Sequence, residues 1–340
     1  MSKPQTPSIR MVAERAGVSV ATVSNVLNGK ASVSPDFAER VLKAVRELGY
    51  VVDIAASRLR SGKAALVGVV VPDLTNPMFA SFVSTLEHAA RLDGYDLVVV
   101  SARNDPAEEA DRLSNLRSWR PAGLIVIPCD GAFAARLPAG QSVPIVVADR
   151  IPDAAGFDLV AVDNGPASAA IGRHLGIVGC RTCLVVGSSL AISNVRERWE
   201  GVSSASGSIA FEMLEVGFEP EAATAVLAQH LGGAARPDAL FALDHMTSLA
   251  LYRLVGSLGL RIPDDIAYAS FDEMEWMRLV SPALTAVRQP VEAMADEAWA
   301  LLSRRMSGGG GEAVTQRLAC AVEFRGSTSR EGPARRSAAA

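Results

Sequence analysis

The chain has 340 residues, of which 49% are apolar and 5% aromatic, and its net charge at neutral pH is −4. This length exceeds what one hydrophobic core usually serves, so we expect two or three folding units. No apolar run approaches the roughly 18–20 residues that cross a bilayer, and the first residues lack the apolar stretch of a secretion signal. These features argue against a membrane protein and predict a soluble, cytoplasmic one.

The charge is distributed unevenly along the chain. Residues 1–63 hold ten basic and five acidic side chains, a net charge of +5, and the remainder therefore carries −9. A cationic segment joined to an anionic body predicts that the N-terminal part binds a polyanion, such as nucleic acid, and that the body does not.

Two short helices are predicted at the start of the cationic segment. Ser8 can cap the first helix and Gly17 can end it, while Ser19 can cap the second. The link between them, "AGVS", has the short, glycine-containing form of a helix-turn-helix turn. The inward positions expected for the first helix are Ile9, Val12, Ala13 and Ala16.

A third helix is predicted after Ser34 and Pro35, which supply an N-cap and a first-turn proline, and it ends at Gly49. Its expected inward positions are Val41, Leu42, Val45 and Leu48. A generic three-helix module is the alternative interpretation, but the cationic charge of the segment argues against it.

The second helix lies within "VSVATVSNVLNGK", residues 18–30, and has an unusual outer face. Ala21, Thr22, Asn25 and Asn28 share that face, whereas a merely solvated helix normally carries Lys and Glu there. Methyl groups, hydroxyls and amides suit base edges and phosphates in the DNA major groove, and Asn25 can pair with an adenine through two hydrogen bonds. The residues predicted to contact DNA in this region are Ser19, Val20, Ala21, Thr22, Ser24, Asn25, Asn28, Ser32 and Ser34.

Residues 51–62, "VVDIAASRLRSG", are predicted to be a hinge. The stretch from Ile54 to Arg60 could form about two helical turns, fewer than the roughly 12–15 residues that make an isolated helix stable in water. We therefore expect it to be helical only where other contacts support it.

From residue 64 the pattern changes to alternating strands and helices. Apolar runs such as "ALVGVVV", "DLVVVS", "GLIVIP" and "PIVVAD", and later "TCLVVGS", "ALFAL" and "DIAYASFD", are typical of buried parallel strands. Two such α/β sets in series predict a two-lobed body with a cleft where the strands end. The segments "LVAVDN" and "LTAVRQP" are expected to cross between the lobes, "MSGGGGEA" to form a flexible loop, and "STSREGPARRSAAA" to be a disordered tail.

These motifs together resemble the LacI/GalR family of repressors. The similarity extends from "IRMVAERAGVSVATVSNVLNGK" through "ASRLRSGKAALVGVVVPDLTNPMFA" and "VAVDN" to "IPDDIAYASFDEMEW" and "SPALTAVRQPVEAM", in the family's order. It implies an α/β protein with a three-helix helix-turn-helix head and a two-lobed, periplasmic-binding-protein-like body of parallel α/β subdomains. The implied domains are residues 1–50 (head), 51–62 (hinge), 63–328 (body) and 329–340 (tail), with an N-lobe of about 63–161 plus 289–328 and a C-lobe of about 162–288.

The resemblance also implies functional residues. In this family a hinge leucine at the place of Leu59 enters the DNA minor groove, and packing on the body is the alternative for this side chain. Arg58 beside it can neutralise phosphate. The effector contacts implied for the cleft are Asp73, Asn76, Phe79, Asp149, Arg198, Asp244, Asp272 and Trp276. Carboxylates and an arginine at strand ends suit a ligand rich in hydroxyls, such as a sugar. For Trp276, packing between the lobes is the alternative to stacking on a sugar ring or a base.

The sequence departs from the family pattern in the second helix, where Ser24 is followed by Asn25 instead of the usual arginine. Because arginine favours guanine and asparagine favours adenine, we expect a shifted base preference at one operator position. The resemblance as a whole implies a homodimeric repressor of the LacI type that is nucleoid-associated. Such a protein binds double-stranded operator DNA and a sugar-like effector.

Other functions have weaker support. The pair Cys180 and Cys183 in "CRTC" lacks the further ligands of a zinc site, and Cys183 begins a strand, so a core role is expected. The sequence holds no phosphate-binding loop, dinucleotide fingerprint or hydrolase motif, so we expect no cofactor, metal or catalytic residue. The alternatives are a transport-type protein that binds a sugar or nucleoside, and a regulator that responds to a nucleoside.

Overall fold

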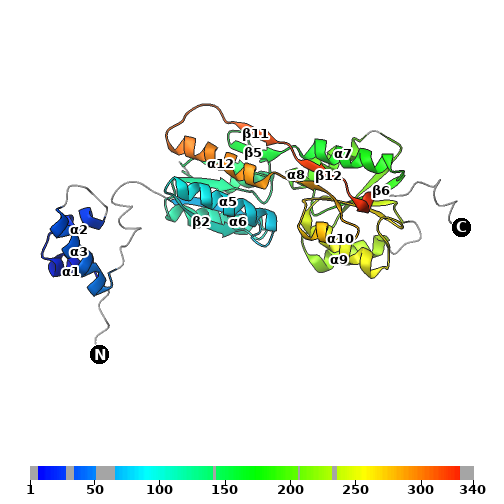
Figure 1. The fold of residues 1–340 in the computed structure, drawn as a ribbon. Coiled ribbons are helices and arrows are strands. Elements are labelled where there is room, and N and C mark those ends of the chain that lie inside the picture. The colour runs from blue at the N-terminus through cyan, green and yellow to red at the C-terminus, as the bar shows by residue number, and fades with distance from the viewer. Residues whose placement is uncertain are drawn as a thin grey trace. The chain divides into compact units, whose positions relative to one another are not determined.

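The computed structural model describes residues 7–27, 34–50, 66–140, 143–205, 207–231 and 236–329. The chain divides into two compact units, residues 1–64 and 65–340. The described parts of these units are called the head and the body (Figure 1). The predicted hinge, residues 51–62, lies outside the described residues.

The head consists of three helices around a small apolar core. They are α1 (Ile9–Ala16), α2 (Val20–Leu27) and α3 (Pro35–Leu48). Val12, Val23 and Val41, one from each helix, are fully buried. The prediction for Leu42 is wrong: it is 44% exposed, and Ala44 is buried instead. Leu42 directly follows Val41, and the turn of roughly 100° per residue in an α-helix carries its side chain off the core face.

Local caps delimit the head helices as the sequence predicts. Ser8 and Ser34 each accept a hydrogen bond from the backbone N–H three residues further on, at 3.4 Å in both cases. Gly17 ends α1 in the left-handed conformation, with φ +64°. The guanidinium of Arg40 on α3 donates to the carbonyl oxygens of Ala16 and Gly17, at 2.6 and 3.1 Å. A cation therefore satisfies the carbonyl groups at the end of α1, next to the turn into α2.

The N-lobe of the body is a sheet with helices on both faces (Figure 1). Its strands, in the spatial order β11-β5-β4-β3-β1-β2, are β1 (Leu66–Val71), β2 (Asp96–Ser101), β3 (Gly123–Val126), β4 (Ile145–Ala148), β5 (Asp158–Val162) and β11 (Thr315–Leu318). One face is covered by α5 (Pro77–Leu92) and α12 (Val291–Met306), and the other by α6 (Pro106–Ser118) and the 3-10 helix η1 (Gly131–Arg136).

The C-lobe repeats this arrangement. Its strands, in the order β12-β10-β9-β8-β6-β7, are β6 (Thr182–Gly187), β7 (Ala210–Glu215), β8 (Ala239–Ala242), β9 (Ala267–Phe271), β10 (Thr285–Arg288) and β12 (Ala321–Glu323). One face is covered by α7 (Asn164–Ile177) and α8 (Ser193–Ser203), and the other by α9 (Pro220–Leu231) and α10 (His245–Ser257), while the short α11 (Trp276–Leu279) follows β9.

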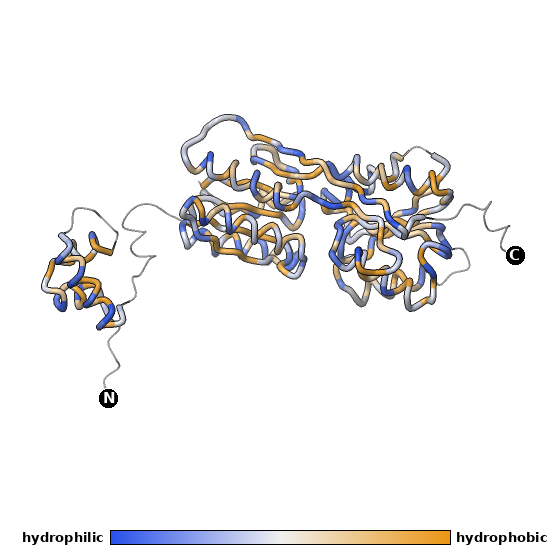
Figure 2. Tube along the Cα trace, viewed as in Figure 1, coloured by the Kyte–Doolittle hydropathy of each residue, from blue (hydrophilic) through white to orange (hydrophobic). Residues whose placement is uncertain are grey.

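The apolar runs of the sequence correspond to the inner strands of both sheets. In the N-lobe, Val69 of β1 lies opposite Val99 of β2 and Ile125 of β3 in parallel register. Because helices cover both faces of a parallel sheet, side chains pointing either way are buried, and the strands need no polar alternation. Figure 2 shows the hydrophobic stretches, in orange, within both lobes. No helix within the described ranges has the length and apolar character needed to cross a membrane.

Three connections join the lobes. The chain passes from β5 into α7, from β10 through Gln289 and Pro290 into α12, and from β11 to β12. The sequence predicts the first two crossings. The assignment of residues 289–328 as a whole to the N-lobe is wrong, because residues 321–323 pair antiparallel with β10 of the C-lobe. A strand of three residues without an apolar run has no clear sequence signature.

The prediction that "STSREGPARRSAAA" is disordered from its first residue, Ser327, is also wrong, whereas the predicted body limit at residue 328 includes the ordered segment. Ser327 and Thr328, the second and third residues of the 3-10 helix η2 (Gly326–Thr328), are fully buried. The Ser327 hydroxyl donates to the Tyr268 carbonyl (2.6 Å) and accepts from the Thr285 amide (2.7 Å). These non-local hydrogen bonds fix a segment whose composition is that of a loop. Residues 330–340 lie outside the described residues.

The two cysteines of "CRTC" lie in the apolar core of the C-lobe. Cys180 and Cys183 are each 1% exposed. Burial raises the pKa of the Cys183 thiol well above its ordinary value. This environment agrees with the predicted core role of Cys183.

Candidate functional site

The N-terminal end of α2 presents small side chains to solvent. Ser19 caps this helix: its Oγ accepts from the Thr22 amide (3.0 Å) and lies 2.9 Å from the Thr22 hydroxyl. Val20 and Ala21 are exposed, whereas Val23 packs in the head core. The helix therefore has an apolar inner face, and a valine, an alanine and two hydroxyls at its outer end.

The other residues predicted to contact DNA fall into two groups. Ser24 and Asn25 on α2 are half-buried, and the exposed Ser34 caps α3. Asn28, Ser32, Arg58 and Leu59 lie outside the described residues. The minor-groove role of Leu59 and the phosphate contact of Arg58 stay predictions.

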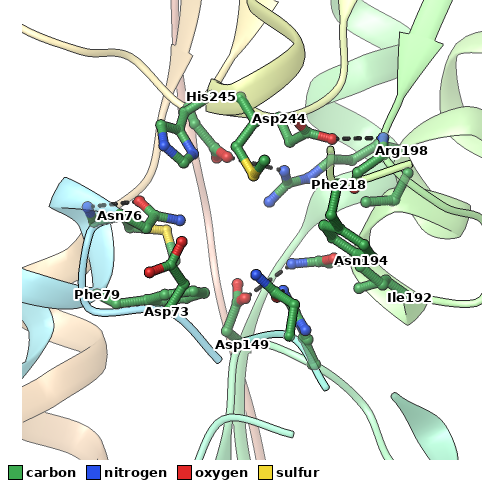
Figure 3. A pocket seen from close by; sticks show the side chains of 17 residues that line it. Asp73, Asn76, Phe79, Asp149, Ile192, Asn194, Arg198, Phe218, Asp244 and His245 are labelled. Atoms are coloured by element: carbon green, nitrogen blue, oxygen red, sulfur yellow. Dashed lines mark hydrogen bonds and ion pairs between the residues drawn. The ribbon is translucent and has the colours of Figure 1, made fainter. Parts of the chain in front are cut away.

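A polar cavity lies in the body, lined by residues of both lobes (Figure 3). It forms where strands of the two sheets reach their carboxyl ends, the usual position of ligand sites in open α/β sheets. Seven of the eight predicted effector contacts line it: Asp73, Asn76, Phe79, Asp149, Arg198, Asp244 and Asp272. The structure therefore brings together residues that are up to 199 positions apart in the chain.

The N-lobe side of the cavity is built around the start of α5. Asn76 caps this helix, with its side-chain oxygen accepting from the Met78 amide (2.9 Å), and its NH₂ group points towards the cavity (Figure 3). Asp73 follows β1 and accepts hydrogen bonds from the amide and the hydroxyl of Thr75, both at 2.8 Å. Phe79, 3% exposed, adds an aromatic side chain from the first turn of α5. Capping thus places polar groups and a ring at one wall of the cavity.

Asp149 and Asp272 stand at corresponding places in the two lobes, directly after β4 and β9. Both adopt left-handed backbone conformations, with φ of +61° and +65°. Such conformations cost of order 1–3 kcal/mol for residues other than glycine and concentrate at functional sites. Asp149 accepts from the Asn194 amide across the lobes (2.9 Å), and Asp272 accepts from the side chain of Gln289. The strained backbone directs each carboxylate into a buried hydrogen-bonding network.

Arg198 is the central cation of the cavity and is 1% exposed. From α8 it donates to the Asn164 side-chain oxygen (2.8 Å), the Leu243 carbonyl (2.7 Å) and the Asp272 carboxylate (3.3 Å). Its guanidinium carbon lies 3.8 Å from the ring centroid of Phe271. These contacts fix the plane of the guanidinium and leave Nη2 without a partner.

The glycine three residues after Arg198 explains how α8 reaches this position. A Cβ on Gly201 would lie 2.3 Å from the carbonyl oxygen of Gly165 on α7. Only a residue without a side chain permits this approach of the two helices. In the R-x-x-G motif, the glycine thus allows the close packing of α8 on α7, and this packing positions Arg198.

Asp244 has a capping role as well as a place in the cavity wall. One carboxylate oxygen accepts from the Thr247 amide (2.9 Å) at the start of α10, and the other accepts from the Ser188 amide after β6 (2.8 Å). The carboxylate thus joins two loops at the carboxyl edge of the C-lobe sheet. Its remaining lone pairs can accept further hydrogen bonds.

Trp276 does not line this cavity, so the structure does not bear out its predicted contact. Its ring packs on Tyr252, with centroids 5.0 Å apart, against the apolar cluster beneath α9 and α10. Trp276 therefore packs within the C-lobe, which is neither the predicted ligand contact nor the alternative of packing between the lobes. The physical reason is that α11 turns this side chain towards the C-lobe core instead of the strand ends.

Sequence reasoning missed five polar residues that line this site and one, Gln289, that donates to a lining residue; the five are Asn104, Arg150, Ser188, Asn194 and His245. Arg150 is 7% exposed and donates to the carbonyls of Pro128 and Cys129, at 3.0 and 2.9 Å. Its signal was available, because an arginine directly after the apolar run "PIVVAD" must be either exposed or paired. Asn194 and Gln289 have no comparable signal, since single amides occur throughout loops and helix ends.

The cations and carboxylates of the cavity influence one another. Burial raises the pKa of the Asp149 carboxyl, and the charges of Arg198 and Arg150 oppose this shift. Burial also lowers the pKa of Arg150, against the stabilising effect of Asp149. Each charged form is therefore costly without its neighbours, so the set operates as a unit.

The cavity retains unused hydrogen-bonding capacity. Among the described residues, six buried side-chain nitrogen or oxygen atoms have no hydrogen-bond partner: Asp149 Oδ1, Arg150 Nε, Asn194 Oδ1, Arg198 Nη2, Gln289 Oε1 and Ser168 Oγ. The first four belong to residues that line the cavity, and Gln289 donates to one that does. Buried polar atoms are normally paired, so donors and acceptors left free in one place indicate a polar ligand with both functions.

A helix-turn-helix head and a two-lobed body with a polar interlobe cavity define a ligand-controlled DNA-binding regulator. Residues 8–53 match the family of bacterial regulatory proteins named lacI, and residues 172–328 match the periplasmic binding protein-like domain. The transcriptional regulator PtxS of Pseudomonas putida is 30% identical over 327 residues, which cover 94% of this chain and 96% of that protein. The chain belongs to the LacI family of bacterial transcriptional regulators.

Solved structures agree with this assignment. The complex of the transcriptional regulator CelR with cellobiose has a TM-score of 0.71 and 26% identity, and the match covers 94% of this chain and 99% of that one. The lac repressor dimer bound to operator and an anti-inducer has a TM-score of 0.83 at 23% identity, covering 95% and 99%, and shares the fold. The observed α/β architecture of head and body is thus that of the family, as the sequence motifs predict.

Proposed function

We propose that this chain is a transcriptional repressor that binds operator DNA as a homodimer and releases or tightens its hold when a sugar or sugar derivative occupies the cavity. The observation that carries the proposal is the set of unpaired buried donors and acceptors at the cavity, in a chain whose head has an exposed helix end suited to the major groove. A single head offers few base contacts, and a two-fold dimer on a pseudopalindrome doubles them.

The proposed DNA contacts follow from the exposure of α2. Val20 and Ala21 can meet thymine methyl groups, and Asn25 can pair with adenine. Hydroxyls of Ser19, Thr22 and Ser34 suit phosphate oxygens, which fix orientation without carrying sequence information. Arg58 and Leu59 keep their predicted roles in the hinge.

Effector control is supported by the hydrogen bonds that cross between the lobes around the cavity. The Ile151 amide in the N-lobe donates to the Ser193 hydroxyl in the C-lobe (2.6 Å), next to the contact between Asp149 and Asn194. A ligand that bonds to both walls changes the balance between open and closed lobes. Coupling of only about 1–3 kcal/mol would be enough to alter a marginally stable hinge helix.

A sugar suits the cavity better than a nucleoside. The two arginines of the cavity offer hydrogen-bond donors and its carboxylates offer acceptors. A sugar hydroxyl can bond to both, because it donates one hydrogen bond and accepts others. Phe79 and Phe218 supply apolar surfaces for the C–H faces of a sugar ring, whereas Trp276, the side chain best suited to stacking on a base, packs elsewhere. The solved relative CelR holds cellobiose in its complex.

A purely regulatory role is part of the proposal. Curated relatives that match nearly the whole chain are named as transcriptional regulators and repressors. A transport-type binding protein would account for the body but leaves the helix-turn-helix head unexplained. We place the protein in the cytoplasm, where its DNA target lies.

The test is a thermal-shift screen of sugars, polyols and nucleosides on the full chain, followed by anisotropy with operator DNA obtained by binding-site selection. We expect a sugar to stabilise the protein and to change operator affinity. Arg150→Met should weaken binding of that sugar about tenfold or more, because a charged hydrogen bond is lost, and leave ligand-free operator affinity unchanged.

Arg181→Met, which alters an exposed arginine outside the cavity, is the matched control and should behave like the parent protein. A sugar that binds equally well to the Arg150 variant contradicts the proposed site. Stabilisation by nucleosides alone would replace the proposed ligand class.

A further inference from the structure

An apolar hollow lies in the C-lobe beside the polar cavity. We call it the annex, and define it by Val216, Ala223, Met246, Leu249, Ala250 and Leu254. These residues come from the segment after β7 and from the facing sides of α9 and α10. The annex is larger than the cavity between the lobes, and no step of the proposed function uses it.

The annex adjoins the polar cavity through three shared side chains. Phe218, His245 and Met246 line both spaces. Figure 3 shows Phe218 and His245 at the C-lobe margin of the polar cavity. Side chains can change rotamer, and methionine adapts its shape readily, so a group attached to a bound ligand can reach from one space into the other.

The two spaces differ in chemistry. Four carboxylates and two arginines line the polar cavity. Of the described residues that line the annex, none is acidic. Arg253, at its exposed margin, is the one side chain among them that is always positively charged. Val216, Ala223 and Leu254 form a floor that is at least nine-tenths buried. A ligand that fills both spaces must therefore carry hydroxyls at one end and an apolar group at the other.

We propose that the annex is a second subsite of the effector, and that the effector is a sugar bearing an apolar substituent, such as an aryl or alkyl glycoside. The proposal rests on the proposed sugar site. The sugar part bonds to the polar cavity, and the substituent passes Met246 and lies between α9 and α10. By binding the substituent, the annex allows the protein to bind a substituted sugar more tightly than the free sugar.

Calorimetric titration of the full chain with matched pairs tests the proposal. The probes are D-glucose, D-galactose and D-ribose, each compared with its phenyl β-D-glycoside. Burial of a phenyl ring predicts about 10- to 100-fold tighter binding of the glycoside in a pair that binds. Ala250→Phe fills the annex and should remove this gain while the affinity for the free sugar is unchanged.

Ala225→Phe, at an exposed position of α9 outside the annex, is the control and should keep the gain. Circular dichroism and the thermal midpoint show whether each variant is folded. A free sugar that binds without a gain from the phenyl group, or a gain that survives in Ala250→Phe, overturns the annex and leaves the sugar site intact. The absence of binding by all six probes overturns both.

Discussion

The head and the body hold the side chains of their proposed sites in different ways. In the head, the exposed end of α2 is organised by a bond between residues three positions apart, Ser19 and Thr22. In the body, Arg198 is held by Asn164, Leu243 and Asp272, which are 34, 45 and 74 positions away in the chain. The head therefore presents a surface encoded by local capping, and the body encloses a site assembled from distant segments.

This difference has an energetic consequence. Exposed side chains on α2 can change with little effect on folding, because the core of the head uses the opposite face. Buried charges in the body support one another, and removal of one leaves its neighbours unpaired. We expect substitutions in the head to separate specificity from stability, and substitutions in the body to affect both.

The largest effect is expected for Arg198→Ala. Removing this cation leaves the buried carboxylate of Asp272 without its charged partner, which should lower the free energy of unfolding of the body by about 3–5 kcal/mol. Effector binding should be lost as well. Hydrogen exchange measured by mass spectrometry on the full chain should show faster exchange in body peptides and unchanged exchange in head peptides.

The control for this variant is Arg317→Ala, which removes the more exposed ion pair with Glu197. It should cost less than about 1 kcal/mol. Equal effects of the two substitutions would show that Arg198 is not the centre of a buried network.

Gly17→Ala is expected to be the most damaging change in the head. An alanine at φ +64° would be strained, and its Cβ would lie 2.6 Å from Nη2 of Arg40, which bonds the end of α1. Left-handed strain together with a lost charged hydrogen bond should cost about 2–4 kcal/mol. Head peptides should then exchange faster, while body peptides and effector binding stay unchanged.

Gly49→Ala provides a matched comparison, because Gly49 has φ +61° but nothing within 4 Å of the added Cβ. We expect a cost of about 1–2 kcal/mol from the backbone alone. If both alanines cost the same, the Arg40 contact contributes nothing to the turn.

Asn25→Arg tests the specificity of the head. Arginine prefers guanine where asparagine prefers adenine, so one operator position should change its preference by about 1–3 kcal/mol. The thermal midpoint of the protein should hardly change, since this side chain is not part of the head core. Binding-site selection with both proteins provides the measurement, and identical selected sites would contradict the role of Asn25.

The smallest effect concerns pH. Burial lowers the pKa of His174, whose Nε2 lies 2.8 Å from the Thr328 hydroxyl. The unfolded chain therefore binds this proton more readily than the folded one. The contribution of His174 to the free energy of unfolding is fully present above pH 6.5, and it is lost as the pH falls towards the lowered pKa of the folded state. Since the side chain is only half-buried, the loss between pH 7 and pH 5 should be less than about 1 kcal/mol.

Denaturant titrations at both pH values check this expectation, with His174→Gln as the variant that does not titrate. The pH dependence of the body should be smaller in the variant. The head contains none of the four histidines, so its stability should not change with His174→Gln at either pH. An identical pH dependence of the body in both proteins would exclude His174 as its source.

Much of this protein could be predicted from its sequence alone. The caps at Ser8, Ser19 and Ser34, the turn at Gly17 and the apolar strand runs depend on short-range geometry and on side-chain hydropathy, so they can be recognised without knowing the fold. The resemblance of the motifs also identified seven of the residues that line the cavity.

Tertiary structure decided the rest. It packs Trp276 against the C-lobe core and adds Arg150, Asn194 and Gln289 to the buried polar network of the site. It also pairs residues 321–323 with β10, so that the chain returns to the C-lobe sheet after crossing to the N-lobe. Each of these outcomes depends on contacts between segments far apart in the chain. Local propensity carries no information about such contacts, because their free energy arises only when both partners are buried together.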